Sequence, residues 1–212
     1  MCKTKRLSSV LIALILVFCL AGCGSSSKPA DTVKGFLDSA KTMDFTKMST
    51  YINPSNSSKV NDMNTKITSD SVEKNLLDYL KTQSSKMTYE IKSSNISGNS
   101  ATVTVNCKYI DGSPFLKEVV AEYVKEAFAS AFSGSQNTDE QTNTLLKNII
   151  GEKQKSVTDT YKESSIDIKC VKINNIWYID SFEDSLANAV TSNFLEAGKE
   201  IASAFSNTTP NK

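Results

Sequence analysis

The side chains able to do chemistry are few in this chain, and the missing types restrict its function first. None of the 212 residues is histidine, and the single arginine is Arg6. Without an imidazole the chain forms neither a Ser-His-Asp nor a Cys-His triad, and it offers no histidine to a zinc ion. A glycine-rich phosphate loop is also absent from the sequence. We therefore predict a protein that is not an enzyme, with no catalytic residues, no metal site and no cofactor.

Cys23 is the thiol with the most specific surroundings. It follows Leu20-Ala21-Gly22 at the end of an apolar run over residues 10–21, and the residues before this run are basic. A membrane-spanning helix needs about 20 residues, and this run is shorter. Small residues before Cys23 are typical of a cleavage site. The sequence therefore predicts a signal peptide at residues 1–22, cut between Gly22 and Cys23.

This segment resembles the lipobox of bacterial lipoproteins. The resemblance implies that the Cys23 sulfur carries a diacylglycerol group and that Cys23 becomes the mature N-terminus. Two acyl chains attach a protein stably, because each buried methylene contributes about 0.8 kcal/mol. We expect a lipid-anchored extracellular protein on the outer face of the cell membrane, with residues 23–29 as its lipidated tether. An ordinary secretory peptide or an uncleaved anchor is the alternative.

Two further cysteines, Cys107 and Cys170, remain in the predicted mature protein. Both lie in segments with the alternating pattern of strands, so they could face one another. An exported pair of this kind is often oxidised. The sequence leaves two alternatives open, a disulfide between Cys107 and Cys170 or two buried free thiols.

The charge balance argues against nucleic acid as a partner. Removing residues 1–22 takes away three of the 24 basic residues and none of the 23 acidic ones, which leaves a net charge of about −2. Nucleic-acid-binding domains instead carry a clear excess of basic side chains. The remaining partners are membrane lipid, through the acylated N-terminus, and an envelope protein or peptide.

Helices and strands must hold these residues, and the hydrophobic period separates the two. Apolar residues recur at helical spacing over residues 31–41, 44–52 and 72–80. The expected N-caps of these helices are Asp31, Asp44 and Asp70. A period of two then predicts strands near residues 87–91, 101–109, 166–170 and 176–180.

A helical insertion separates the second and third predicted strands. It contains a long amphipathic segment over residues 115–131 and a shorter one near residues 145–150, which we expect Gly151 to end. A long closing helix is expected after Ser181. The predicted fold is one α+β domain over residues 30–206, with N-terminal helices packed on a curved four-stranded antiparallel sheet. Residues 207–212 are expected to be a flexible tail.

Three segments taken in order resemble a known family. They are Thr32–Phe45, Asn99–Val105 and Lys172–Asp180, the last of which contains Trp177. The chain is similar to lipoproteins of Gram-positive bacteria that carry a cystatin-like, cone-shaped domain of the nuclear transport factor two superfamily. In that family an amphipathic helix packs on a curved sheet that ends in a Trp-containing strand. The lipoprotein members are largely of unknown function, so the resemblance implies a fold and no site residues.

The resemblance also suggests an alternative function. Some cone-fold relatives are isomerases or dehydratases that abstract a proton next to a carbonyl, using an acidic base and a phenol. Asp180, Tyr178 and Tyr109 could do this on a small apolar carbonyl compound if they faced one cavity. Strand alternation places Tyr178 and Asp180 on one face, and Trp177 and Ile179 on the other. The simpler interpretation is that Trp177 and Ile179 belong to the core and Asp180 ends the strand.

The favoured hypothesis is a non-catalytic binding or structural module at the cell envelope, with its ligand unidentified. Its surface would be an apolar helix stripe, either that of the closing helix or that of the insertion. Ordinary core packing is the simpler explanation of each stripe. Two long amphipathic helices nevertheless offer more apolar surface than one sheet face readily covers. The stripe of the insertion contains Phe115, Val119, Tyr123, Phe128 and Phe132.

Overall fold

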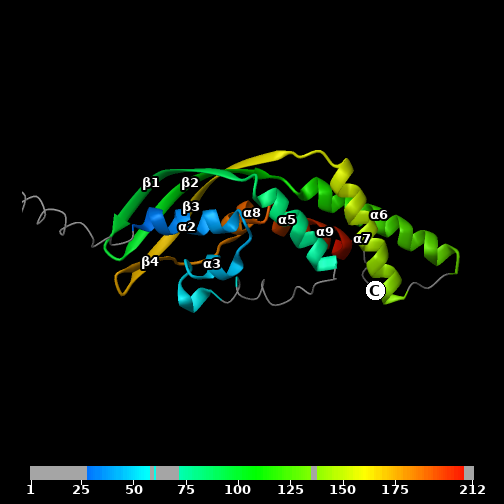
Figure 1. The fold of residues 1–212 in the computed structure, drawn as a ribbon, viewed down its shortest axis with the longest axis horizontal. Helices are drawn as coiled ribbons and strands as arrows, with labels where there is room; N and C mark the ends of the chain where they lie inside the picture. Colours follow the sequence, from blue (N-terminus) through cyan, green and yellow to red (C-terminus); the bar gives the residue numbers. More distant parts are fainter. Residues whose placement is uncertain (1–27, 58–59, 61–71, 135–137, 208–212) are drawn as a thin grey trace, which may run out of the picture.

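The computed structural model of this chain describes residues 28–57, 60, 72–134 and 138–207. Helices cover one face of a four-stranded antiparallel sheet and extend beyond one of its ends (Figure 1), which confirms the α+β fold class. In chain order the elements are α2 (Pro29–Ala40), α3 (Phe45–Ser49), η1 (Pro54–Asn56), α5 (Val72–Ser84), β1 (Thr88–Ser97), β2 (Ser100–Ile110), α6 (Ser113–Phe132), α7 (Asp139–Ser156), β3 (Tyr161–Ile173), β4 (Ile176–Ile179), α8 (Asp184–Val190) and α9 (Phe194–Asn207).

The sheet has the strand order β1-β2-β3-β4, and all its pairs are antiparallel. Alternate side chains point to opposite faces of a strand, so the predicted period of two sorts them into a buried and an open set. On β2 and β3 the buried set includes Val103, Val105, Ile166 and Ile168, each at most 3% exposed. Their neighbours on the other face are polar, as is usual for an antiparallel sheet with one solvated side.

Both edges of the sheet are irregular or short. On β1 the register shifts between Ile91 and Ser93, so Lys92 is an extra residue in a β-bulge. At the other edge, β4 has four residues, and Ile52 forms an isolated parallel bridge with Ile179. Neither edge therefore presents a long regular row of open backbone groups.

Helix α2 lies across the buried face of the sheet and fills its core (Figure 1). Val33, Phe36 and Leu37 are fully buried, in agreement with the predicted stripe. The helix begins two residues earlier than expected, since Pro29 is its first residue and Lys28 its N-cap. Asp31 is not the cap. Its carboxylate instead accepts a hydrogen bond of 3.3 Å from the Lys28 backbone N–H.

The other predicted caps have different outcomes. Asp44 caps α3, because its carboxylate accepts a hydrogen bond of 2.9 Å from the Lys47 N–H. Asp70 lies outside the described residues. Gly151 does not end a helix, since α7 runs through it to Ser156. Thr138 starts α7 with a capping box that includes Gln141, a signal at the sequence level that was overlooked.

The molecule has two parts, each with its own core. We call β1–β4 with α2, α3 and α8 the sheet body, and α5, α6, α7 and α9 the helical end. The core of the helical end is small and consists of Tyr79, Phe115, Val119, Ile149 and Ile150. The β1–β2 and β3–β4 turns lie at the opposite end of the molecule, where α2 also begins (Figure 1).

The closing segment forms two helices in place of the expected single long one. Helix α8 packs on β2 and β3, and the chain then turns sharply before α9. Ser192 and Asn193 have φ values of +51° and +62°, a left-handed conformation that no α-helix continues through. The turn lets α9 leave the sheet body and pack beside α6.

Candidate functional site

The two core cysteines are buried free thiols in this structure, which is one of the two alternatives that the sequence left open. Cys107 pairs with Ser164 across the sheet, whereas Cys170 pairs with Ala101. Ser164, the partner of Cys107, and Cys170 are therefore six residues apart along β3. At about 3.3 Å per residue this is roughly 20 Å. A disulfide requires Cα atoms within about 7 Å.

Burial also makes both thiols poor nucleophiles. It raises the pKa of the Cys107 thiol to about 11. Burial, with a smaller contribution from the charge of Asp180, raises the pKa of the Cys170 thiol to about 12. Because the thiolate is the reactive form, neither side chain suits covalent chemistry near neutral pH.

The acid and the two phenols of the alternative enzyme hypothesis do not converge. Tyr109 pairs with Lys162 of β3, and Tyr178 pairs with Val171 of the same strand. These two partners are nine residues apart, so the two phenols are separated by roughly 30 Å along the sheet. Tyr109 is 3% exposed on the core face, where burial raises the pKa of its phenol. Tyr178 and Asp180 lie on the other face, and Trp177 and Ile179 are in the core.

Asp180 has a structural contact that the sequence did not reveal. Its carboxylate accepts a hydrogen bond of 3.1 Å from the Asn53 side-chain amide. Its backbone carbonyl accepts one of 2.7 Å from the Asn56 amide. Asp180 therefore fastens the segment after α3 to the end of β4.

Cys23 and Gly22, the predicted lipidation and cleavage residues, lie outside the described residues, as does most of the predicted tether. Their roles stay predictions. Among the described residues, no helix is long and apolar enough to cross a membrane. Within the described ranges, no group of three or more acidic or thiol side chains is placed to hold a metal ion.

A cleft with a volume of about 710 Å³ lies between α5 and α7. Its lining is polar, and its side chains bond to one another. The Lys86 ammonium donates to Gln83 at 2.9 Å and forms an ion pair with Asp159. Tyr79 adds a phenol whose pKa burial raises to about 12, so it stays protonated.

The predicted stripe on α6 divides into a buried half and an open half. Phe115 and Val119 are 1% and 6% exposed and form the core of the helical end, so core packing explains that half. Phe128 and Phe132 are 62% and 90% exposed. Core packing does not explain these two rings, which lie near the C-terminal end of α6 and on a different side of the helix from Phe115 and Val119.

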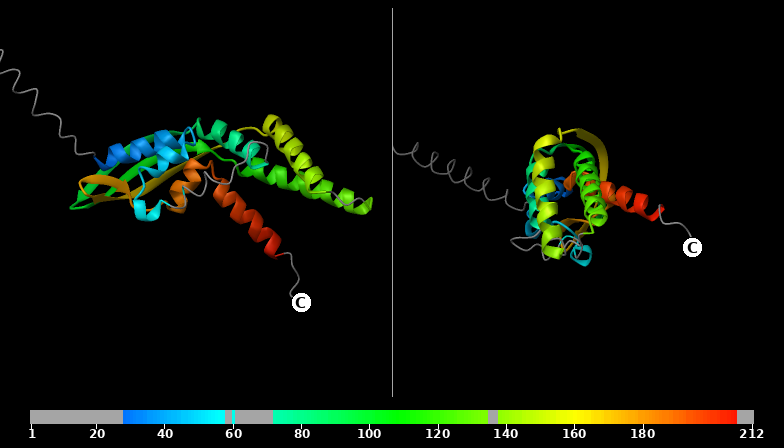
Figure 2. Two further views of the ribbon diagram at one scale, coloured as in Figure 1. Left: turned by 60° about the horizontal axis from the view of Figure 1, so that its bottom comes forward. Right: turned by 90° about the vertical axis from the view of Figure 1, so that its right-hand side faces the viewer.

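An apolar groove runs between α6 and α9, and the two helices diverge toward their C-terminal ends (Figure 2). The groove has a volume of about 450 Å³. Phe205 on α9 is 54% exposed at its border. We call this feature, with Phe128 and Phe132, the α6/α9 surface. The groove is lined by Lys117, Val120, Ala121, Val124, Ile201, Ala204 and Phe205.

A group of hydrogen bonds between the start of α6 and the turn before α9 positions this surface. The Asn193 side-chain amide donates to the Asp111 carboxylate and to the Ser113 hydroxyl, both at 2.9 Å. The Gly112 N–H donates to the Ser192 carbonyl at 2.8 Å. Burial acts to raise the pKa of Asp111, but the bonds from Asn193 and Ser113 outweigh it and lower that pKa below its usual value.

Gly112 allows the two segments to approach this closely. A Cβ atom at Gly112 would lie 2.1 Å from Cε2 of Phe194 and 2.9 Å from the Ser192 carbonyl oxygen. Any larger residue there would push α9 away from α6. Nothing in the sequence indicated this contact between the start of α6 and Asn193.

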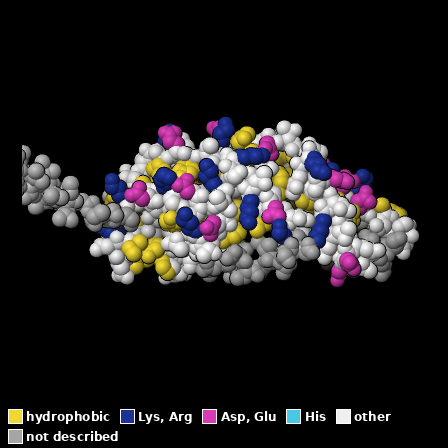
Figure 3. Space-filling model, viewed as in Figure 1, with side chains coloured by type: hydrophobic (Ala, Val, Ile, Leu, Met, Phe, Trp, Pro, Cys, Tyr) yellow, Lys and Arg dark blue, Asp and Glu magenta, His cyan; other side chains and the backbone are white. Residues whose placement is uncertain are grey.

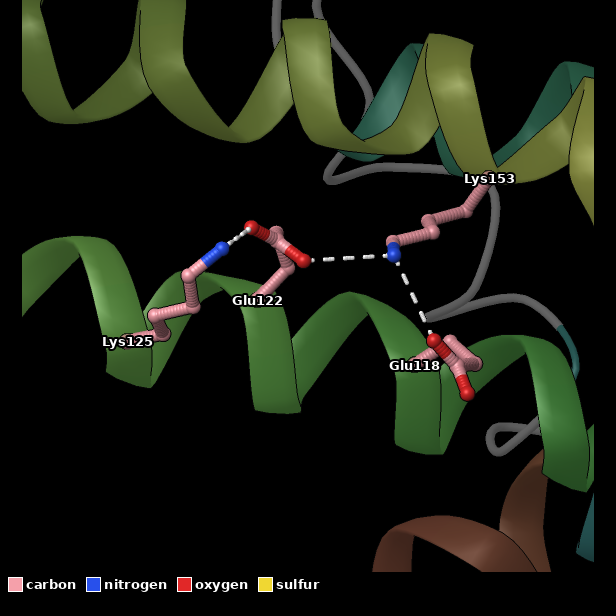
Figure 4. A network of polar contacts seen from close by, with 4 residues as sticks. All are labelled: Glu118, Glu122, Lys125 and Lys153. Atoms are coloured by element: carbon pink, nitrogen blue, oxygen red, sulfur yellow. Dashed lines mark hydrogen bonds and ion pairs between the residues drawn. The ribbon is translucent and has the colours of Figure 1, made fainter.

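On its other side, α6 is held to α7 by an ionic network (Figure 4). The Lys153 ammonium of α7 lies 3.3 Å from the carboxylates of both Glu118 and Glu122 on α6. Glu122 also pairs with Lys125 at 2.7 Å. Hydrogen bonds from Lys125 and Lys153 lower the pKa of Glu122, so the network is charged across the neutral range. The network joins α6 and α7 along the faces that point away from α9.

The fold and this surface define a class of protein, an α+β domain with a helical extension that exposes an apolar groove. The chain belongs to the family called domain of unknown function DUF4878, whose model matches residues 21–129, about half of the chain. The match runs from the segment before Cys23 to near the end of α6. No curated protein matches the chain.

One solved structure is similar to this chain, that of ycdA from Bacillus subtilis, described as a candidate lipoprotein. The two share 18% sequence identity with a TM-score of 0.43. The aligned region covers 66% of this chain and 48% of ycdA, so this chain spans about half of the length of that protein.

Proposed function

We propose that this protein is a lipoprotein, attached through Cys23 to the outer face of the cell membrane of a Gram-positive bacterium. Its folded domain then acts without catalysis, as a docking module that binds an apolar helical surface of an envelope protein. The observation that carries the docking role is the α6/α9 surface, where Phe128 and Phe132 remain largely open to solvent.

The anchoring part of the proposal is supported by sequence. Leu20-Ala21-Gly22-Cys23 follows a basic start and a short apolar run, and the match to the DUF4878 family begins at residue 21. Helix α2 begins at the end of the molecule opposite to α6 and α7 (Figure 1). A tether that precedes α2 would therefore leave the α6/α9 surface at the end away from the anchor.

A non-catalytic role is supported by the positions of the reactive groups. Tyr109 and Tyr178 are separated by nine residues of β3, and the thiols of Cys107 and Cys170 are buried with raised pKa values. A general acid and base must both reach one substrate within hydrogen-bond distance. No such pair is assembled among these predicted residues.

The kinship to the cystatin-like cone fold is also a proposal. Its support is the order of elements: an amphipathic α2 on the sheet, strands that turn at Gly98 and Asn174-Asn175, and a Trp-containing β4. Trp177 is 5% exposed and packs in the core. The fold alone does not decide function, because one fold supports many activities.

Replacing Cys23 with alanine tests the anchor. We expect the C23A chain to keep residues 1–22 and to lack a lipid mass, because the alkylated sulfur is what the processing step recognises in a lipobox. Mass spectrometry of the N-terminal peptide measures both. Recovery of a normally processed and membrane-bound C23A protein would refute the anchor.

A photo-reactive phenylalanine analogue at position 132 tests the docking role in intact cells. We expect a protein adduct at this position and none when the analogue replaces Ser165, which is exposed on the polar face of β3. Phe128→Glu should remove the adduct, since it places a charge in the apolar contact. Equal adducts at both positions, or an adduct that F128E leaves unchanged, would contradict docking through this surface.

A further inference from the structure

The α6/α9 surface has enough open apolar area to form a substantial part of a protein interface. Phe128, Phe132 and Phe205 are 62%, 90% and 54% exposed. Fully burying an aromatic side chain removes about 150–250 Å² from water, so these three rings would bury roughly 300–500 Å² together. A stable interface uses about 800 Å² from each partner. The three rings therefore supply about half of that area before the groove itself is counted.

The open rings continue the groove along one face of α6. Ala121, Val124, Phe128 and Phe132 follow one another at intervals of three and four residues, which places them on one side of the helix. Small side chains thus lie in the groove and large ones at its open end. A surface that carries both knobs and holes can pack against a copy of itself, with the rings of one molecule over the alanines of the other.

The charges beside the groove are paired within the chain. Lys117 of α6 forms an ion pair with Glu200 of α9 at 2.8 Å. Lys199 of α9 pairs with Asp184 of α8 at 2.5 Å. Figure 3 shows that acidic and basic side chains are also interspersed over the face of the molecule it presents. This pairing suits a second copy, because identical surfaces repel only when they carry a net charge.

The same pairing argues against a lipid surface as the occupant. Helices that lie on anionic membranes carry lysine and arginine along their polar face. Here Lys125 pairs with Glu122, and Lys117 pairs with Glu200. Phe132 also lies at the end of the molecule opposite to the start of α2, away from the proposed anchor.

We propose that the occupant of the α6/α9 surface is a second copy of this chain, related by a two-fold axis. The α6 and α9 helices of the two copies then form a four-helix arrangement around the buried phenylalanine rings. This inference rests on the proposed docking function and names its partner. Attachment to one membrane favours it further, because tethering raises the effective concentration of one copy near another.

Thiol cross-linking of the full chain in native membranes tests the dimer. Ala204→Cys places a thiol in the groove, whereas Ser203→Cys places one at the neighbouring exposed position on the opposite side of α9. The native Cys107 and Cys170 are buried, so they do not react with a short bismaleimide. We expect a band of twice the monomer mass for A204C, several-fold stronger than for S203C. F128E, which changes an exposed residue, should reduce the A204C band to the S203C level.

The outcomes separate this inference from the proposed function. Equal dimer bands for A204C and S203C would overturn the dimer, since they reflect random collision. A monomeric A204C chain, together with a position-132 photo-adduct of a different polypeptide that F128E removes, would overturn the dimer and leave the docking function standing. If the position-132 analogue also gives no adduct, both proposals fail. Circular dichroism of F128E should match the unmodified chain, which excludes misfolding as the cause.

Discussion

The sheet body and the helical end bury their apolar side chains to very different extents. In the sheet body, Val33 and Phe36 of α2 and Val105 of β2 are fully buried. In the helical end, five residues form the core, while Phe128 and Phe132 stay open on the same helix that supplies Phe115. The comparison teaches that periodicity decides which face of a helix is apolar. The periodicity of α6 gives it two apolar sides, and the position of the neighbouring helices decides which of them is buried.

The largest expected effect of a substitution is in the core of the sheet body. Phe36→Ala should lower the free energy of unfolding by about 3–5 kcal/mol, because the ring is fully buried and packs edge-on against Phe182 at 5.9 Å. Phe132→Ala, at a 90% exposed position, should change it by less than about 0.5 kcal/mol. Urea unfolding of both variants measures the contrast. At protein concentrations where the chain is monomeric, a loss above about 2 kcal/mol for F132A would mean that its ring is buried within the monomer.

The junction between the two parts should show the next largest effect. Asn193→Ala removes the amide that bonds to Asp111 and Ser113, and leaves a partly buried carboxylate with fewer donors. We expect a loss of about 1–3 kcal/mol in the free energy of unfolding. Hydrogen exchange should locate the increase in opening in α6 and α9, with α2 and β2 unchanged. A uniform increase over all helices and strands would show that the two parts unfold as one unit.

The pH dependence of the free energy of unfolding should also distinguish the junction from the sheet body, with a smaller effect than the two substitutions above. The folded pKa of Asp111 lies below its usual value of 3.8, so its contribution to stability is present above that pH and is lost as the pH falls through the folded pKa. Asp111→Asn should therefore reduce the stability lost between neutral pH and pH values below 3.8. Unfolding by urea at several pH values measures this, and an unchanged pH dependence would contradict the assignment.

Asp38 in α2 is the matched control for that experiment. Hydrogen bonds from Lys34 and Tyr89 lower its pKa, and it is exposed on the sheet body. Solvent screening weakens such an exposed group. We expect Asp38→Asn to change the acid dependence less than Asp111→Asn does.

The smallest perturbation uses thiols as reporters of local opening. The native Cys107 and Cys170 report on the sheet body, and Val119→Cys, at a position 6% exposed, reports on the helical end. A small core opens more readily than a large one. We therefore expect a thiol reagent, without denaturant, to label position 119 faster than the two native cysteines. Equal rates at all three positions would remove the distinction between the two parts.

Much of the sheet body could be predicted from the sequence, because local periods determine it. The alternation of Val103 and Val105 with polar residues set the buried face of β2, and Trp177 and Ile179 lie in the core as expected. The same alternation placed both cysteines on the buried face. It could not give their relative positions along the strands, because register depends on how two distant segments pair.

The candidate site was only half visible in the sequence. Phe115, Val119 and Tyr123 recur every four residues, but Phe128 follows Tyr123 by five, so Phe128 and Phe132 lie on another side of α6. The spacing separates two apolar sides of the helix, and nothing local says which of them neighbouring helices cover. The break before α9 depends on Asn193, whose partners Asp111 and Ser113 are about 80 residues away in the chain. Gly151 misled the prediction for α7, since packing of Ile149 and Ile150 in the core offsets the low helix propensity of one glycine.

The irregular edges of the sheet have a consequence for molecules crowded on a surface. An open, flat edge strand is a template for cross-β growth, and dense packing on a membrane would bring many such edges together. The bulge at Lys92 twists one edge away from that geometry, and the other edge offers four residues beside the Ile52 bridge. The chain is thereby protected against amyloid-like stacking at high surface density, and reversible contacts are left to its helices.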